Sequence, residues 1–221
     1  MRVSEIFTSI EGEGIRQGFA CTFVRLYGCP LRCSYCDTRY ACEGGSFSLM
    51  SPGDIAARVK EAGAGMVTLT GGEPLAADGI GELVNRLLAE GFRLNIETSG
   101  HVDYTALFPD EFRRRHRDAL LLTVDWKSPS SGMQKMMNRE CFRHLQMQDV
   151  LKFVVSDESD LDDMRRMIGT FRPECHLFVG AVFGRIEPRE IAEYLIRHNL
   201  GRVRLQLQMH KYIWDPAARG V

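Results

Sequence analysis

The 221-residue sequence has almost no net charge and no long apolar run, and both absences exclude classes of protein. A formal net charge of -1 offers no electrostatic basis for binding nucleic acid or an anionic membrane. No apolar stretch approaches the roughly 20 residues of a membrane span, and residues 1–5 lack the apolar core of a signal peptide. The basic run at 113–117 is better explained as a solvated helix face than as an RNA-binding site. We therefore expect a single globular domain with no nucleic-acid or membrane partner.

The sequence also lacks a fourth cysteine at matching distance from its clustered three. Cys29, Cys33 and Cys36 have the spacing Cys-x3-Cys-x2-Cys. A structural zinc site requires four protein ligands, whereas three thiolates leave one iron of a [4Fe–4S] cluster open. S-adenosylmethionine can chelate that iron through its amino and carboxylate groups, and electron transfer into its sulfonium then releases a carbon radical. We predict such a radical site, in preference to a zinc knuckle with a distant His, a disulfide pair or a loop without ligands.

Cys42 is the remaining candidate for a fourth ligand. It precedes Glu43-Gly44-Gly45, so we interpret it as a bystander in a loop that leads away from the cluster. Seven cysteines, three of them clustered, are typical of a metal site in a reducing cytoplasm rather than of a secreted disulfide scaffold. The other three are expected in the core: Cys21, Cys141 and Cys175.

Strand and helix patterns alternate along most of the chain. Helices are predicted from Ser51-Pro52, over 80–88, over 158–171 and from Pro188. Strands are predicted at 21–27, 66–70, 92–98, 120–125, 150–155, 176–179 and 203–208, after a polar, glycine-punctuated segment at 4–18. This alternation predicts an α/β fold with a parallel sheet, whose working loops follow the carboxyl ends of the strands.

Four successive predicted strands end in polar loops, and we place the active site at that edge. The loops are the cysteine loop, 71–74, 97–100 and 125–129. Backbone groups around Gly72 and Glu73 suit the α-amino group of S-adenosylmethionine, although a plain tight turn is the alternative. The polar residues farther along the edge could hold its carboxylate and ribose, or be surface groups: Ser99, Asp125, Trp126 and Lys127.

Several other polar residues have both a functional and an ordinary interpretation. The Thr38 hydroxyl suits a hard cation such as Mg²⁺, or a turn. Arg25 could reach an anionic substrate, or be an edge charge. Glu11 and Glu13 flank Gly12, where a small ligand could approach, or form a turn with two solvated acids. His210 follows the last strand and is a candidate at the same edge.

Together these segments resemble the 7-carboxy-7-deazaguanine synthase family of the radical S-adenosylmethionine superfamily. The matching segments are 9–14, 29–38, 70–74, 97–100 and 208–211. The resemblance implies a partial or modified (β/α) barrel, with 1–221 as a single radical S-adenosylmethionine domain. Residues 1–20 would be a substrate-binding N-terminal segment, and residues 209–221 a C-terminal tail near the active site.

The resemblance also implies a reaction and its partners. A lyase of this kind contracts the ring of 6-carboxy-5,6,7,8-tetrahydropterin to 7-carboxy-7-deazaguanine and releases ammonia, on the route to queuosine and other 7-deazapurines. It uses a [4Fe–4S] cluster, S-adenosylmethionine and Mg²⁺, receives electrons from a flavodoxin-type donor and forms a homodimer.

By position, the resemblance assigns Cys29, Cys33 and Cys36 to the cluster and Thr38 to Mg²⁺. The residues expected at S-adenosylmethionine are Tyr35, Cys36, Asp37, Gly72, Glu73, Ser99, Asp125, Trp126 and Lys127. The residues expected at the pterin are Ile10, Glu11, Gly12, Glu13, Arg25, Thr70 and His210.

The sequence departs from the family pattern in three places. Glu11 stands where many relatives have Gln. The loop Gly180–Gly184 is apolar, so we expect only backbone contacts with S-adenosylmethionine there. The chain continues beyond Pro216, where some relatives end.

Two rival hypotheses remain. One is a glycyl-radical-enzyme activase, which shares the cysteine triad but needs an open groove for a protein loop. The other is a non-catalytic iron–sulfur or zinc protein that serves as a sensor or electron carrier.

Overall fold

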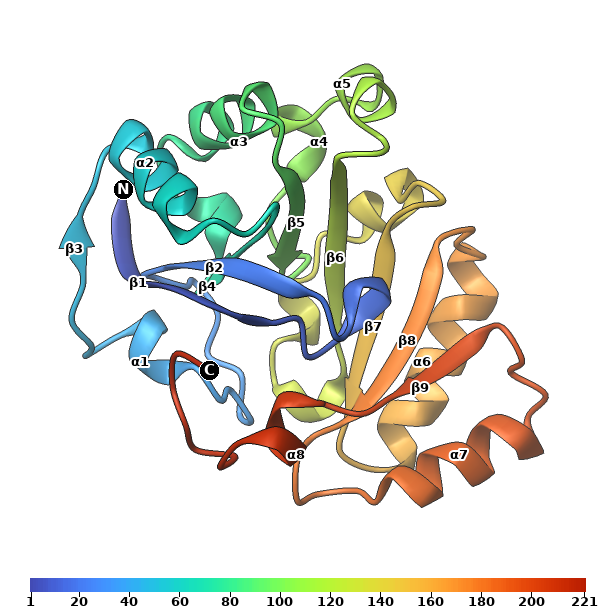
Figure 1. The fold of residues 1–221 in the computed structure, drawn as a ribbon. Helices are drawn as coiled ribbons and strands as arrows, with labels where there is room; N and C mark the ends of the chain where they lie inside the picture. The colour runs from blue at the N-terminus through green and yellow to red at the C-terminus, as the bar shows by residue number, and fades with distance from the viewer.

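The chain folds around one open, curved nine-stranded sheet, seen in a computed structural model that describes residues 1–221 (Figure 1). The strand order is β3-β1-β2-β4-β5-β6-β7-β8-β9, and the six neighbouring pairs from β2·β4 to β8·β9 are parallel. The strands are β1 Arg2–Ile10, β2 Ala20–Leu26, β3 Ser48–Leu49, β4 Met66–Gly71, β5 Arg93–Thr98, β6 Leu120–Lys127, β7 Val150–Val155, β8 His176–Ala181 and β9 Val203–Gln206. The sheet is therefore the partial (β/α) barrel that was predicted.

The longer helices cover the outer, apolar side of this sheet (Figure 1). The helices are α1 Arg39–Cys42, α2 Pro52–Ala62, α3 Ile80–Ala89, α4 Tyr104–Leu107, α5 Asp110–Arg115, α6 Glu158–Phe171, α7 Pro188–Arg197 and α8 His210–Ile213. The short helices α1 and α8 instead lie at the cavity that opens at the carboxyl ends of the strands. The predicted start of α2 is confirmed: Ser51 and Asp54 form a reciprocal capping box, and Pro52 occupies the first turn. None of the helices is long and apolar enough to cross a membrane.

The parallel strands alternate between apolar residues that face the helices and polar residues that face the barrel interior. In β5, Leu94 and Ile96 belong to the core, whereas Glu97 lines the interior cavity. In β7, Leu151 and Phe153 face the core and Lys152 the cavity. Successive side chains of a strand point to opposite faces of the sheet. A charged side chain can therefore face the barrel interior while its neighbours remain in the core.

The N-terminal segment differs from the prediction, because most of it is a strand. Residues Arg2–Ile10 form β1, which pairs antiparallel with β2 and extends the sheet on one side. Beyond β1, the segment crosses to the opposite edge of the sheet. The backbone N–H of Met209 donates to the carbonyl of Gly12 (3.1 Å), and that of Gly14 donates to the Gln206 side chain (2.6 Å). These contacts, rather than strand pairing, bridge the gap between β1 and β9.

The interpretation of the basic run as a fully solvated face is also corrected. Arg113 is only 1% exposed and forms an ion pair with Asp149, which is fully buried. A second guanidinium nitrogen of Arg113 donates to the carbonyl of His144 (2.9 Å). The run is therefore partly a structural element that ties α5 to the segment before β7, with Arg114, Arg115 and Arg117 on the solvent side.

Candidate active site

One cavity of about 610 Å³ opens at the carboxyl ends of the strands. Its wall is built from the cysteine loop, the loops after β4 and β5, the inward residues of β6 and β7, the segment after β1 and the C-terminal tail. Of the predicted site residues, the structure gathers these around it: Ile10, Glu11, Gly12, Glu13, Arg25, Cys29, Cys33, Tyr35, Cys36, Asp37, Thr38, Thr70, Gly72, Ser99, Asp125, Lys127 and His210. Glu73 and Trp126 lie outside it.

The three clustered cysteines lie on one loop at the wall of this cavity, and all are free thiols. No group of three or more His, Cys, Asp or Glu side chains is placed to hold a single metal ion. Three thiols on one loop beside a polar cavity are the donor set of a [4Fe–4S] cluster with one open iron. The residues present therefore fit that cluster.

Cys42 is closer to the triad than predicted. It lies in α1 rather than in a loop that leads away, and its sulfur is 3.9 Å from that of Cys36. A hydrogen bond with Cys42 lowers the pKa of Cys36 to about 6 and that of Cys29 to about 7, whereas the pKa of Cys42 itself is raised by the same bonds. The Cys42 thiol donates to the carbonyl of Thr38 (3.6 Å), and the lowered pKa values favour the thiolate forms of Cys29 and Cys36.

The glycines at the end of β4 allow close approach of two backbone segments. A Cβ on Gly71 would lie 2.1 Å from the carbonyl oxygen of Leu26, and one on Gly72 would lie 2.2 Å from that of Gly28. The N–H of Gly72 donates to Leu26 (2.9 Å), so the turn is bonded to the end of β2 directly before the cysteine loop. The absence of Cβ atoms at these two positions lets the cysteine loop pack directly against the end of β4. It also leaves the backbone of Gly72 at the cavity wall.

The Glu73 carboxylate supports the site from behind. It is 1% exposed and accepts hydrogen bonds from the Thr98 hydroxyl (2.8 Å), the Ser99 N–H (2.7 Å) and the Leu75 N–H (3.0 Å), as well as from the Ser99 hydroxyl. A side-chain contact between Glu73 and a ligand in the cavity does not fit this arrangement. Glu73 instead joins the loop after β4 to the loop after β5.

Alternation along β6 separates Trp126 from its neighbours Asp125 and Lys127. Asp125 and Lys127 face the cavity and form an ion pair (2.7 Å), whereas Trp126 packs in the core and donates through Nε1 to Asp163 (2.8 Å). The predicted contact of Trp126 with S-adenosylmethionine therefore does not extend to its side chain. Burial favours the neutral form of Lys127, but the nearby Asp125 outweighs it and raises the pKa of the ammonium group.

Two carboxylates after β1 have opposite electrostatic settings. Burial raises the pKa of Glu11 to about 7, with a further contribution from Glu97, and the Thr68 hydroxyl donates to it. Burial would also raise the pKa of Glu13, but the charge and hydrogen bond of Lys152 outweigh it and hold that pKa below its ordinary value. The interpretation of both as solvated acids is therefore wrong. Near neutral pH the Glu11 carboxyl is partly protonated, and the Glu13 carboxyl stays ionised.

The remaining predicted pterin residues are fixed by specific partners. Nε of Arg25 donates to Glu5 (2.6 Å), and the Thr70 hydroxyl donates to Glu97 (2.9 Å). His210 lies at the start of α8 against Gly12, and burial lowers the pKa of its imidazole. At neutral pH that imidazole therefore remains uncharged.

Thr38, Asp37 and Tyr35 line the cavity from the cysteine loop and the residues directly after it. Thr38 stands at the N-cap of α1, yet its hydroxyl makes no capping hydrogen bond, so its oxygen is available to a ligand. Asp37 lies 3.6 Å from the Lys211 ammonium, and the Tyr35 hydroxyl donates weakly to the carbonyl of Val154 (3.4 Å). These contacts connect the cysteine loop with α8 and β7.

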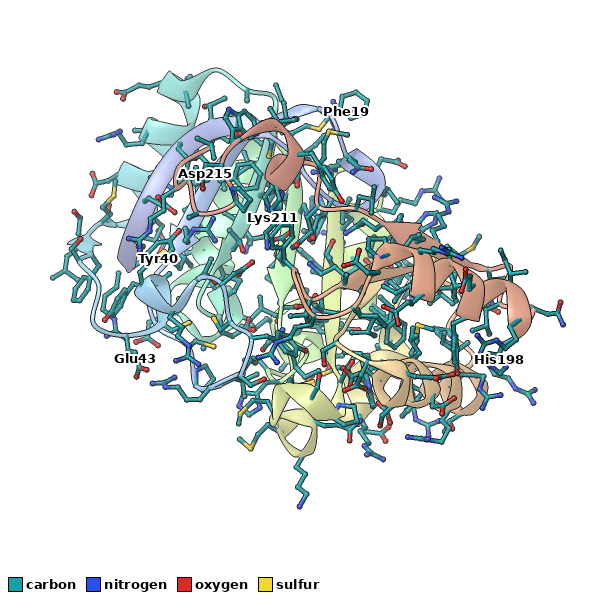
Figure 2. The ribbon with its side chains drawn as sticks, turned by 90° about the horizontal axis from the view of Figure 1, so that it is seen from below. Phe19, Tyr40, Glu43, His198, Lys211 and Asp215 are labelled. Atoms are coloured by element: carbon teal, nitrogen blue, oxygen red, sulfur yellow. The ribbon has the colours of Figure 1, made fainter.

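The C-terminal tail and the loop after β8 complete the wall. Residues 215–221 line the cavity, and the Arg219 guanidinium lies 4.1 Å from the centre of the Tyr40 ring. In Figure 2, seen from below, Lys211 lies near the middle of the barrel, and Asp215 and Tyr40 lie to its left. Ala181, Val182 and Phe183 form an apolar stretch of the same wall.

Lys152 is the main site residue that the sequence analysis missed. Its ammonium group lies 2.6 Å from Glu13 and 3.6 Å from Asp125. A charged residue flanked by Leu151 and Phe153 in a predicted buried strand is the signal that could have identified it, because its side chain must point to the side opposite the core.

Comparisons with known proteins agree with this geometry. Residues 23–146 match the Radical SAM superfamily. The chain is 41% identical to the 7-carboxy-7-deazaguanine synthase of Clostridium acetobutylicum, over 100% of this chain and 99% of that protein. It is 38% identical to the synthase of the same name from Chlorobaculum tepidum, over 100% of this chain and 97% of that protein. The crystal structure of QueE from Escherichia coli shares the fold, with a TM-score of 0.71, 23% identity and 93% of each chain covered.

Proposed function

Because the chain belongs to the 7-carboxy-7-deazaguanine synthase family of the radical S-adenosylmethionine superfamily, we propose that it contracts the ring of 6-carboxy-5,6,7,8-tetrahydropterin. The products are 7-carboxy-7-deazaguanine and ammonia, which places the enzyme among the lyases of 7-deazapurine biosynthesis, on the route to queuosine. The observation that carries the proposal is the single cavity that unites a three-cysteine loop with a set of buried charged residues. Neither an activase nor a non-catalytic iron–sulfur or zinc protein is favoured by these relatives.

The cysteine loop supplies the ligands for the cofactors. Cys29, Cys33 and Cys36 would hold the cluster, and S-adenosylmethionine would lie beside it against Tyr35, Asp37, Gly72, Ser99, Asp125 and Lys127. When bound, the cluster and S-adenosylmethionine supply the carbon radical that begins the ring contraction. The backbone around Gly72 is accessible from the cavity, and the ion pair of Asp125 with Lys127 offers both an acceptor and a donor.

The segment after β1 supplies the groups that recognise the pterin. The pyrimidinone half of a pterin presents N–H donors, and an ionised carboxylate such as Glu13 is an acceptor only. Because its pKa is about 7, Glu11 is partly protonated near neutral pH. In that form it can donate a hydrogen bond to the carbonyl oxygen of the pyrimidinone ring. Arg25 carries a fixed positive charge at the cavity wall, which suits the carboxylate of the substrate. Ile10, Gly12, Thr70 and His210 complete this half of the pocket.

The finer predictions belong to the same proposal. The Thr38 hydroxyl, which does not cap α1, would bind Mg²⁺ together with oxygen atoms of the substrate and water. A flavodoxin-type donor would reduce the cluster, and the working form would be a homodimer in the cytoplasm, where its seven free thiols stay reduced. Residues 1–221 would act as one domain, with 1–20 and 209–221 contributing to the site from the two ends of the chain.

An anaerobic turnover assay tests the proposal. The reconstituted protein is supplied with dithionite, S-adenosylmethionine, Mg²⁺ and carboxytetrahydropterin, and carboxydeazaguanine is identified by mass and ultraviolet spectrum. A Cys33→Ala variant is the control. Product that disappears in the variant supports the proposal. If 5′-deoxyadenosine forms without carboxydeazaguanine, the radical chemistry is right and the substrate is wrong.

A further inference from the structure

Lys152 stands at the centre of the charged residues inside the barrel. It projects from β7 into the cavity, and its side chain is only 13% exposed. Its ammonium group donates to Oε2 of Glu13 at 2.6 Å and lies 3.6 Å from Oδ1 of Asp125. Glu97 of β5 faces the same interior and interacts electrostatically with it. The ammonium group of Lys152 therefore interacts with carboxylates from three separate segments of the chain.

A buried carboxylate stays ionised and in place only when it has a partner. For Glu13 that partner is Lys152, whose bond also holds the flexible Glu13 side chain in one orientation. For Asp125 the closer partner is Lys127, at 2.7 Å against 3.6 Å for Lys152. Lys152 therefore pairs mainly with Glu13 of the N-terminal segment, and Lys127 pairs mainly with Asp125 beside the cysteine loop.

We propose that Lys152 is a positioning residue that holds the ionised Glu13 carboxylate where the pyrimidinone ring of the pterin binds. The inference rests on the proposed function, since it assumes that the pterin lies against Glu13. Lys152 acts through Glu13 and has no separate contact with the pterin. Its loss weakens pterin binding far more than binding of S-adenosylmethionine, because Asp125 keeps Lys127.

A double-mutant cycle tests this role. The variants are Lys152→Met, Glu13→Gln and the two combined, with Lys152→Arg as the conservative replacement. Two quantities are measured: the anaerobic Kd of carboxytetrahydropterin without turnover, and the KM values of both substrates. We expect each single variant to raise the pterin Kd at least about tenfold, the cost of one charge-assisted hydrogen bond. The double variant should bind the pterin no more than about threefold more weakly than Glu13→Gln, and Lys152→Arg should stay near wild type.

The cycle also separates positioning from plain stability. Arg113→Met removes a buried cation from an ion pair outside the cavity, so it should lower the melting temperature and leave the pterin Kd unchanged. If Lys152→Met does not fold, the double variant, which leaves no unpaired charge on Glu13, is compared with Glu13→Gln alone.

Four results overturn the inference. Additive effects of the two substitutions would mean that Lys152 acts independently of Glu13. Equal rises in the KM of the pterin and of S-adenosylmethionine would mean a general defect of the site. Wild-type protein that makes 5′-deoxyadenosine but neither binds nor converts the pterin overturns the proposed function, and this inference with it. Wild-type conversion with an unaffected Lys152→Met variant overturns the inference alone.

Discussion

The imidazole of His210 lies against the α-carbon of Gly12, so close that a Cβ at position 12 would lie 2.2 Å from Nδ1. The two residues come from opposite ends of the chain, and the N–H of Met209 donates to the Gly12 carbonyl (3.1 Å) beside them. Both line the cavity. The absence of a side chain at Gly12 is therefore what allows the His210 ring to occupy its place.

Replacement of Gly12 by Ala should move that ring. A contact of 2.2 Å is far inside van der Waals range, so the imidazole must rotate or α8 must shift. Because His210 is expected at the pterin, we predict that Gly12→Ala raises the KM for the pterin about tenfold or more, equivalent to about 1.4 kcal/mol. The measurement is anaerobic steady-state kinetics. Gly65→Ala, at a position with open space around the Cβ, is the control. An unchanged KM would show that His210 does not need its observed position.

The buried carboxyl of Glu11 should make stability depend on pH. Its pKa is raised from 4.5 to about 7, so between these values the folded state binds more protons than the unfolded state. Stability therefore falls as the pH rises through this window. We predict that the free energy of unfolding of wild type falls by on the order of 2 kcal/mol more than that of Glu11→Gln between pH 5 and 7.5.

Urea denaturation of the apoprotein at several pH values measures this difference. Glu90→Gln, at an exposed position, is the matched control and should follow the wild-type curve. Parallel curves for wild type and Glu11→Gln would show that Glu11 is ionised throughout, and would remove its role as a donor to the substrate.

Cys42 and Cys33 should behave differently when replaced. We expect Cys33→Ala to lose most of its iron and sulfide, because a cluster ligand is removed. Cys42→Ala should keep the wild-type content, since Cys42 is not one of the three assigned ligands. Its cluster should be harder to reduce, because hydrogen bonds to the sulfur atoms raise the reduction potential. Iron and sulfide analysis and a redox titration monitored by electron paramagnetic resonance measure both effects. Loss of the cluster in Cys42→Ala would make Cys42 a ligand.

Local sequence patterns were sufficient for most of the parallel sheet. Strand 150–155 and helix 158–171 were predicted with the bounds that the structure shows. Strand β1 was not predicted, because Arg2–Ile10 has no buried face of its own beyond Val3 and depends on antiparallel pairing with β2. Such pairing joins residues up to 23 positions apart, as in Val3 with Leu26, and the residues of one strand alone do not encode it.

In the site too, local motifs could be predicted from the sequence, and contacts between separate segments could not. The cysteine loop and the glycine turn after β4 are local motifs, and both were placed at the correct edge. Trp126 was assigned with Asp125 and Lys127 as one motif, although adjacent residues of a strand face opposite sides. Lys152 was missed because its partner, Glu13, is 139 residues away in the sequence.

The tail beyond Pro216 should contribute to pterin binding. Residues 217–221 line the cavity, and Arg219 lies over the ring of Tyr40 in α1. Deletion of these residues removes part of the wall and a cation–π contact worth about 0.5–1 kcal/mol. We therefore expect the KM for the pterin to rise by about threefold to tenfold, with a loss of at most about 1 kcal/mol in the free energy of unfolding.

Arg219→Ala in the full-length chain separates the two contributions. It abolishes the contact with Tyr40 but leaves the backbone of the tail, so its effect should be smaller than that of the deletion. A Tyr40→Leu variant should have a larger effect than Arg219→Ala, because it also removes the hydrogen bond from the Tyr40 hydroxyl to Glu5 (2.8 Å). If the deletion leaves the KM at the wild-type value, the tail is dispensable for binding, and the rest of the wall forms the pocket without it.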